Sequence, residues 1–421
     1  MAVYLRQFAT AANRRFLSPR ATIAAHMMTI NSKERKSNAK NGIYYLLAYG
    51  CFKFKLNNKR NLFMVNVILF EEAIADSDRY AKRHLLLGNG FSISCRADIF
   101  HYSSLYEEAD FSEVPEVERV FEALNTHDFE IAIRSLENAA ALLPIYSQSD
   151  SDASIKMREH ASTLKDILIK TIAKNHPETP SSINYNEFYS CQDFLSHFLV
   201  SNKGGYVFTL NYDLLLYWTL MQDRNPFDTS AQELNKNDSF GNDEDEPDAD
   251  YVVWQGETAA HSANILFLHG ALHLFDAGAE LQKYTWVRSG MPLVTQARQA
   301  VDDNKFPLFV SEGTSEQKKN KILHNAYLYQ CLKVLTANAQ TGTHCFFIFG
   351  HSLAANDDHI LRRLGKGSFK TLYVGLYGDK DSVDNKAIIQ RANALAVMRH
   401  ERKPLEIIFF DSASAKVWNR Y

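Results

Sequence analysis

Cysteines are few in this sequence, and long apolar runs are absent. The five cysteines in 421 residues lie far apart without a Cys-x-x-Cys pair. This spacing excludes a tetracysteine zinc site and a disulfide framework, and it favours a reducing compartment such as the cytoplasm. Every apolar run falls short of the roughly 18 residues of a membrane span, so we expect no membrane segment. With 46% hydrophobic and 23% charged residues, the composition is that of a folded globular protein.

Acidic residues are nearly missing from the first 63 positions, which carry 12 lysines and arginines and the single acid Glu34. Three interpretations of this basic N-terminal extension remain open: an organellar transit peptide, a nucleic-acid-binding arm, and a dispensable stretch ahead of a start at Met64. We favour the third and do not expect nucleic acid as a partner. The predicted organisation is an extension over residues 1–63 and one folded domain over 64–421.

Short, almost continuously apolar runs recur through the folded domain, separated by segments of helical periodicity. Such runs are typical of parallel strands that are buried on both faces. We therefore predict an α/β fold with a doubly wound, mostly parallel sheet. The predicted strands are RHLLLGNG (83–90), GGYVFTLNYD (204–213), ANILFLHG (263–270), HCFFIFGHS (344–352), FKTLYVGLYG (369–378) and LEIIFF (405–410).

Two segments interrupt this alternation. Residues from about 110 to 180 place apolar side chains at intervals of three and four, which predicts an α-helical insertion between the first two of these strands. Residues 224–250 are rich in Asn, Asp, Ser, Gly and Pro and predict a solvated acidic loop. The loop does not keep the register of a calcium-binding EF-hand loop, and we expect no metal.

Polar clusters follow four of the predicted strands: GNGFS at 88–92, TLNYD at 209–213, LHGALH at 268–273 and FGHSLAANDDHI at 349–360. In open parallel sheets, ligands bind at the carboxyl ends of the strands. The glycine pair allows a tight turn and close approach of a pyrophosphate to the backbone. It is followed by Ile93 where the dinucleotide fingerprint has a third glycine, so the match to that fingerprint is incomplete.

Together and in this order, the clusters resemble the SIR2-like family, the NAD-binding fold of sirtuin deacylases and of bacterial NAD-consuming defence proteins. GNGFS resembles the sirtuin GAGxS turn, TLNYD the TxNxD strand end, LHG the catalytic histidine-glycine pair, and FGHSL the GxSL segment. More narrowly, the sequence is similar to a bacterial SIR2-like group known as DUF4917. The fold that this resemblance implies is SIR2/Rossmann-like.

The resemblance implies a role for each matching residue. Asn211 and Asp213 contact the nicotinamide ribose and His269 is the acid/base residue, with His273 as its rival four positions later. Asp357 or Asp358, at a predicted helix start, is a candidate to face the adenosine, and we take Asp357. The remaining implied nucleotide contacts are Gly88, Asn89, Gly90, Phe91, Ser92, Thr209, Gly350 and Ser352.

Departures from the sirtuin pattern narrow the expected function. Asn89 replaces a small alanine, and neither the GIPDFR-like stretch nor a zinc ribbon is present. We therefore expect cleavage of NAD to nicotinamide and ADP-ribose rather than deacylation. The partners expected are NAD or a related nucleotide and, in a defence role, a second protein or further copies of the chain. Cyclisation, ADP-ribosyl transfer and non-catalytic sensing of NAD or ADP-ribose remain open alternatives.

Overall fold

The computed structural model describes residues 65–146, 151–200, 203–225, 232–260, 262–278, 280–285, 290–302, 305–311 and 313–418. The basic extension over residues 1–63 lies outside the described residues. None of the described helices is long and apolar enough to cross a membrane.

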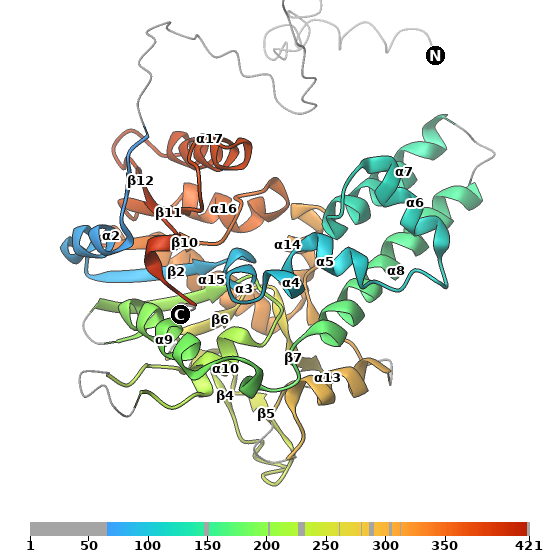
Figure 1. Cartoon of the computed structure of the whole chain (residues 1–421), viewed down its shortest axis with the longest axis horizontal. Coiled ribbons are helices and arrows are strands. Elements are labelled where there is room, and N and C mark those ends of the chain that lie inside the picture. Colours follow the sequence, from blue (N-terminus) through green and yellow to red (C-terminus); the bar gives the residue numbers. More distant parts are fainter. Residues whose placement is uncertain are drawn as a thin grey trace, which may run out of the picture. The chain divides into compact units, whose positions relative to one another are not determined.

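A seven-stranded, entirely parallel sheet forms the centre of the fold (Figure 1). The predicted strands all lie in it, which confirms the α/β class. Strand β11 is buried at every position, as expected where helices cover both faces. In spatial order the strands are β1 (Val67–Ile68), β12 (Glu406–Asp411), β11 (Thr371–Leu376), β10 (His344–Phe349), β2 (Lys82–Leu87), β3 (Gly204–Thr209) and β6 (Ile265–Phe267).

The order of these strands creates a switch point between β2 and β10. From β2 the chain proceeds outward through β3 to β6, and then returns to β10 on the other side of β2 and proceeds through β11 to β12. Without the edge strand β1, this is the 3-2-1-4-5-6 order of dinucleotide-binding domains, in which ligands bind at the switch point.

Helices cover the sheet in two layers. Phe347 of β10 packs against Phe70 and Phe198, which come from the two helices of one layer. Phe346 points to the opposite face, as strand alternation requires, and packs against Phe369. The first layer contains α2 (Phe70–Asp76) and α9 (Tyr185–Leu199), and the second contains α15 (Ala326–Ala339), α16 (Asp358–Gly365) and α17 (Val383–Val397).

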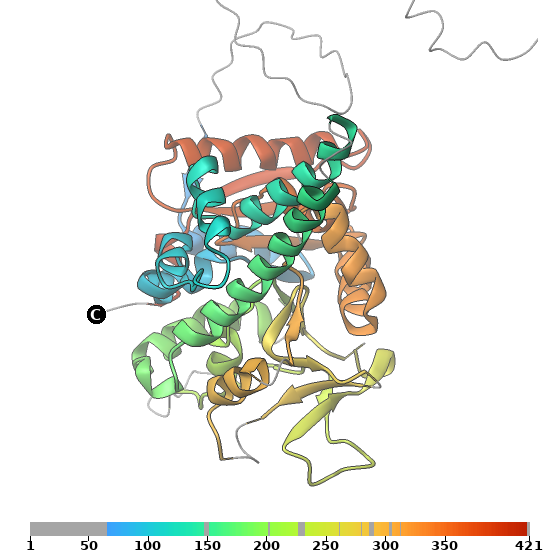
Figure 2. The ribbon, with the colours of Figure 1, turned by 90° about the vertical axis from the view of Figure 1, so that its right-hand side faces the viewer.

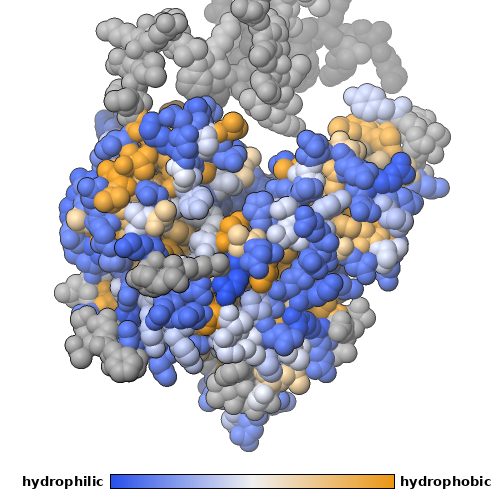
Figure 3. Space-filling model, viewed as in Figure 1, coloured by the Kyte–Doolittle hydropathy of each residue, from blue (hydrophilic) through white to orange (hydrophobic). Residues whose placement is uncertain are grey.

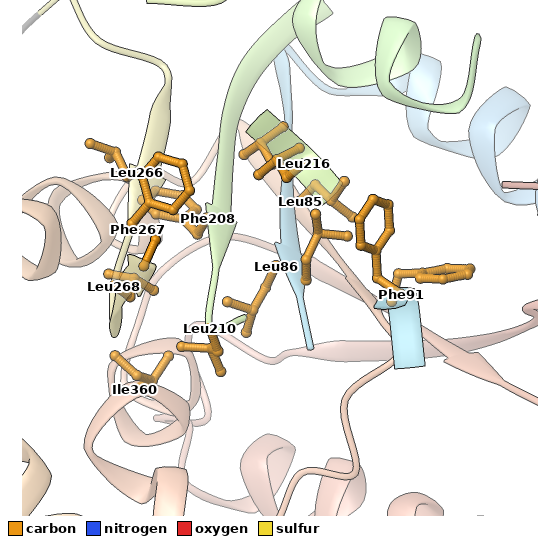
Figure 4. Packing of buried hydrophobic residues seen from close by; sticks show 14 of the residues in the cluster. Leu85, Leu86, Phe91, Phe208, Leu210, Leu216, Leu266, Phe267, Leu268 and Ile360 are labelled. Carbon is orange, nitrogen blue, oxygen red and sulfur yellow. The ribbon is translucent and has the colours of Figure 1, made fainter. Parts of the chain in front are cut away.

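Apolar side chains from three adjacent strands and the helices beside them hold the strand ends in place (Figure 4). Leu86 of β2, Phe208 of β3 and Leu266 of β6 have no exposed surface. Full burial of a side chain of this size stabilises the fold by roughly 1.5–3 kcal/mol. The loops after these strands therefore start from fixed positions.

Helices also fill the stretch between β2 and β3, where the sequence predicts an insertion (Figure 2). The long helices α7 and α8 pack along each other. At their far end, hydrophobic side chains such as Ile145 and Tyr146 are exposed, and hydrophobic patches appear over this part of the surface in Figure 3. The helices are α3 (Gly90–Cys95), α4 (Ala97–Phe100), α5 (Tyr102–Glu107), α6 (Pro115–Leu124), α7 (Phe129–Tyr146) and α8 (Ser151–Asn175).

A second, antiparallel sheet is a feature that the sequence analysis missed. Gly270, the last residue of LHG, has φ +79° and begins a new strand. The segment ANILFLHG, predicted as one strand, therefore contributes to two sheets. The strands are β4 (Phe240–Gly241), β5 (Tyr251–Trp254), β8 (Leu281–Tyr284), β7 (Gly270–Asp276) and β9 (Pro307–Phe309). The remaining α-helices described are α10 (Leu215–Met221), α11 (Gly256–Ala260), α13 (Leu293–Asp302) and α14 (Ser315–His324).

Candidate functional site

A cavity of about 930 Å³ lies at the carboxyl ends of the parallel strands. Its wall is built from the loops after β2, β3, β6, β10 and β12, and from helices of the insertion. The volume is that of a pocket for a small molecule or cofactor. The sequence-predicted site residues in this wall are Gly88, Asn89, Gly90, Asn211, Asp213, His269, Gly350, Ser352 and Asp357.

The glycines of the two switch-point loops pack against each other. A Cβ on Gly90 would lie 2.6 Å from the Gly350 Cα, and one on Gly88 would lie 2.7 Å from the His351 Cβ. Gly350 itself has φ +70°, a conformation that favours glycine. The sequence interpretation, that these glycines keep space for a ligand above the backbone, is therefore incomplete, because the neighbouring loop already fills the space that a Cβ would need.

Gly90→Ala is expected to destabilise the protein by about 1–3 kcal/mol, the range for overpacking, because the obstructing atoms belong to the backbone of Gly350. Urea unfolding measures the change. The matched control is Gly342→Ala, where a Cβ would meet its nearest neighbour at 3.5 Å, and here we expect little loss. Equal stability of the two variants would contradict the close packing of the loops.

Three predicted residues lie behind the wall and support it. Phe91 is buried, and its ring packs 5.3 Å from that of Trp418. Thr209 accepts the backbone N–H of Asn211 at 3.0 Å. Ser92 accepts the Asn211 side-chain N–H at 2.9 Å and donates to Asp213 at 2.5 Å. These side chains position the site rather than line it.

Asn211 and Asp213 therefore differ in what they offer to a ligand. The second oxygen of Asp213 accepts the backbone N–H of Leu215 at 2.9 Å, so both carboxylate oxygens already have partners. Burial raises the pKa of Asp213 above its ordinary value, against the hydrogen bond from Ser92. By contrast, the side-chain oxygen of Asn211 accepts no hydrogen bond from the described residues. Asn211 thus lines the cavity and has a side-chain oxygen to which no described residue donates a hydrogen bond.

His176, at the end of the helical insertion, fixes the loop that carries Asn211. Its Nε2 accepts the backbone N–H of Leu214 at 3.0 Å, and its Nδ1 donates to the carbonyl of Pro177 at 3.0 Å. These two bonds require the neutral ring. Burial lowers the pKa of His176 to about 4.

Stability is expected to fall on acidification because the unfolded state protonates His176 first. With a pKa of 6.5 unfolded and about 4 folded, the contribution is complete above pH 6.5 and is lost as the pH falls toward 4. The loss between pH 7 and pH 5 should be about 2 kcal/mol from this residue. Urea unfolding at the two pH values measures it. In His176→Gln the pH dependence should be shallower, and an unchanged slope would contradict this assignment.

His269 lines the cavity, whereas its rival His273 does not. The His269 Nε2 lies 3.0 Å from the Nε2 of His359 and 3.9 Å from an Asp357 oxygen. Burial and then the charge of Lys318 lower the pKa of His269 well below its ordinary value. His273 is buried between Tyr217 and Phe267, and neither of its ring nitrogens has a hydrogen-bond partner in the described part of the chain.

The sequence analysis did not predict a buried ion-pair network that lies beside His269. The Lys318 ammonium lies 2.9 Å from both oxygens of Glu130 and 3.0 Å from one oxygen of Asp357. The other Asp357 oxygen accepts the Nε2–H of His351 at 3.0 Å. Burial would lower the pKa of Lys318, but the two carboxylates raise it above its ordinary value.

The two neighbouring acids, Asp357 and Asp358, lie in different surroundings. The Asp358 carboxylate pairs with Arg362 and Arg391, at 3.3 and 3.1 Å. Asp357 is the one in the cavity wall. Burial would raise the pKa of Asp357, but Lys318 and the His351 hydrogen bond hold it well below its ordinary value.

His269, His359 and Asp357 also form the type of group that can bind a metal, with ligand atoms within 4.8 Å of one another. Two features oppose that role. The two Nε2 atoms are at hydrogen-bond distance from each other, and the Asp357 oxygen already accepts from Lys318. The described contacts of these atoms are therefore hydrogen bonds and an ion pair within the protein.

Fold and cavity together define an α/β protein with the strand order of dinucleotide-binding domains and a pocket at its switch point. Within that class, the chain belongs to the family described as Domain of unknown function (DUF4917), which matches residues 85–418. The match confirms the narrower of the two resemblances found in the sequence. It begins within β2 and includes all the predicted site residues. No curated protein matches the chain.

Proposed function

We propose that this protein is a SIR2-like NAD hydrolase, which cleaves the bond between nicotinamide and ribose to give nicotinamide and ADP-ribose. One observation carries the proposal. Asn211 and His269, the two residues that match the catalytic motifs of the SIR2-like family, come from different strand ends and line the same cavity at the switch point.

The charge of the cavity suits this chemistry. Glu130 and Asp357 share the single cation Lys318, so this buried trio carries a net charge of −1 when all three are ionised. Cleavage of a glycosidic bond passes through a state with positive charge on the sugar ring. Fixed negative charge in a water-poor site stabilises such a state. The same charge attracts the cationic nicotinamide group of the substrate.

Asn211 and His269 have different roles in the proposed cleavage reaction. The amide oxygen of Asn211 can accept a hydrogen bond from a ribose hydroxyl or from the attacking water. His269 is held neutral at pH 7 because its pKa is lowered, so it can accept a proton from that hydroxyl or water. The leaving nicotinamide is already cationic and needs no proton.

The cellular role that fits this activity is depletion of NAD by an antiviral defence effector. This role is an analogy to the SIR2-like family, because a fold alone does not fix a function. A second protein or further copies of the chain would then control the activity. Cyclisation and ADP-ribosyl transfer would use the same residues with a different acceptor.

Product analysis of the purified protein incubated with NAD tests the proposal. We expect nicotinamide and ADP-ribose in equal amounts. A cyclic product would indicate cyclisation instead of hydrolysis, and a modified protein would indicate ADP-ribosyl transfer. Binding of NAD by calorimetry without release of nicotinamide would favour a sensor, and the absence of both would contradict the proposal.

A further inference from the structure

The cavity extends over both halves of the parallel sheet. Asn211 and His269 follow β3 and β6, which lie on one side of the switch point. Tyr377 and Ser412, in the same wall, follow β11 and β12 on the other side. A dinucleotide binds across such a switch point, and each half of the fold takes one of its two nucleotides. Because the proposed cleavage places the nicotinamide ribose at Asn211 and His269, the adenosine belongs to the half that carries Tyr377.

The ring of Tyr377 has no stacking partner among the described residues. Tyr377 is 79% exposed where it lines the cavity, and it forms no aromatic or cation–π pair within the part of the chain that the structure describes. Tyr373 of β11 instead stacks on Phe347, with ring centres 4.3 Å apart and ring planes 12° apart. An exposed aromatic ring in a cavity wall offers a flat surface on which a base can stack.

The backbone that carries Tyr377 is fixed by Asn385 of α17. The Asn385 side-chain amide donates to the carbonyls of Tyr377 and Asp379, both at 2.8 Å, and Asn385 is buried. Gly378, between these two carbonyls, has φ +73°, a conformation that favours glycine. A tyrosine on a fixed backbone has only two side-chain torsions to restrict, so stacking on its ring costs little conformational entropy.

Side chains beside Tyr377 in the wall add hydrogen-bonding groups for a sugar. Asp384 is exposed in the first turn of α17, and Ser412 directly follows β12. Within the described ranges, neither side chain has a hydrogen-bond partner. A carboxylate and a hydroxyl can both bind the hydroxyl groups of a ribose. This half of the cavity therefore combines an aromatic surface with polar groups, as a nucleoside requires.

We propose that Tyr377 is a nucleotide-binding residue whose ring stacks on the adenine of NAD. The proposal rests on the proposed hydrolase function, which assigns the nicotinamide ribose to the other half of the sheet. The adenine takes no part in the bond cleavage, so this contact stabilises the bound substrate and the transition state alike. The ring and not the hydroxyl of Tyr377 makes the contact, so phenylalanine can replace it.

Calorimetry with ADP-ribose, which contains the adenine but no nicotinamide, tests this role. We expect Tyr377→Ala to raise the dissociation constant of ADP-ribose about 10- to 100-fold, the scale for loss of base stacking on an aromatic ring. Tyr377→Phe should bind like the wild type. The matched control is Tyr146→Ala, because Tyr146 is 84% exposed but lies outside the cavity wall, and it should also bind like the wild type.

Equal affinity of Tyr377→Ala and the wild type for ADP-ribose would overturn the proposal, as would a wild type that does not bind ADP-ribose. Nicotinamide mononucleotide separates the two ends of the ligand, because it lacks the adenosine. Its affinity should be the same in the wild type and in Tyr377→Ala. A loss as large as that for ADP-ribose would place Tyr377 at the nicotinamide end and also overturn the proposal.

Steady-state kinetics of nicotinamide release from NAD provide a further readout. Loss of a contact that is equal in the ground state and the transition state raises KM and leaves kcat unchanged. We therefore expect Tyr377→Ala to raise KM and to keep the kcat of the wild type, and a lowered kcat with unchanged KM would contradict the assignment. ADP-ribose binding that depends on Tyr377, without any nicotinamide release by the wild type, would refute the hydrolase function and support the stacking role.

Discussion

His269→Ala and Asn211→Ala should each lower the turnover of NAD on the order of 10²- to 10⁴-fold, the scale for loss of a positioned acid/base group. Both residues line the cavity, and in the proposed mechanism His269 accepts the proton while Asn211 accepts a hydrogen bond from the ribose hydroxyl or water. NAD binding should weaken much less than turnover, because the rest of the wall is unchanged. The measurements are kcat from nicotinamide release and the dissociation constant of NAD from calorimetry.

His273→Ala is the internal control for this prediction. His273 belongs to the same LHGALH segment but is buried outside the cavity, where its nitrogens have no partner among the described residues. Its replacement should change turnover far less than that of His269. If His273→Ala alone were inactive, the assignment of His269 as the base would be wrong.

The strands and their polar ends could be predicted because the information is local. Leu85 to Leu87 form a short apolar run that no helical period fits, and the Gly88–Gly90 turn ends it. Once such runs are taken as parallel strands, their carboxyl ends must share one edge of the sheet. The meeting of Asn211 and His269 in one cavity follows from this rule.

The ion-pair network could not be predicted because its members are brought together only by folding. Glu130 and Lys318 are 188 positions apart. Within the sequence of its own helix, each of these residues resembles an ordinary charged residue on the protein surface. No local pattern marks a lysine whose side chain is 1% exposed. The position of His359 beside His269 could not be predicted either, because the sequence marks His359 only as part of a predicted helix start.

The glycines show a different limit, in which the sequence pattern predicts a close approach to the backbone but not the group that approaches. Glycine after a strand signals close approach of something to the backbone. For Gly90 the structure identifies that neighbour as Gly350 of the adjacent loop. A sequence pattern states that space is needed but does not state which group occupies it.

Lys318→Met should destabilise the protein by about 3–5 kcal/mol, the cost of removing one partner from a buried ion pair. The substitution leaves the carboxylates of Glu130 and Asp357 facing each other in a buried site without their cation. Urea unfolding at pH 7 measures the loss. Adding Glu130→Gln to this variant should recover part of it, because one of the two unpaired charges is then removed.

Lys156→Met is the matched control, since it breaks a lysine–glutamate pair of similar length, 2.8 Å, in which both side chains are at least half exposed. Solvent screens such pairs, and the loss should be about 0–1 kcal/mol. The substitution is the same at both sites, so the contrast reports the combined effect of burial and of the second carboxylate that faces Lys318. A Lys318→Met variant as stable as Lys156→Met would mean that the network beside His269 is hydrated, and the electrostatic support for cleavage of a cationic substrate would be lost with it.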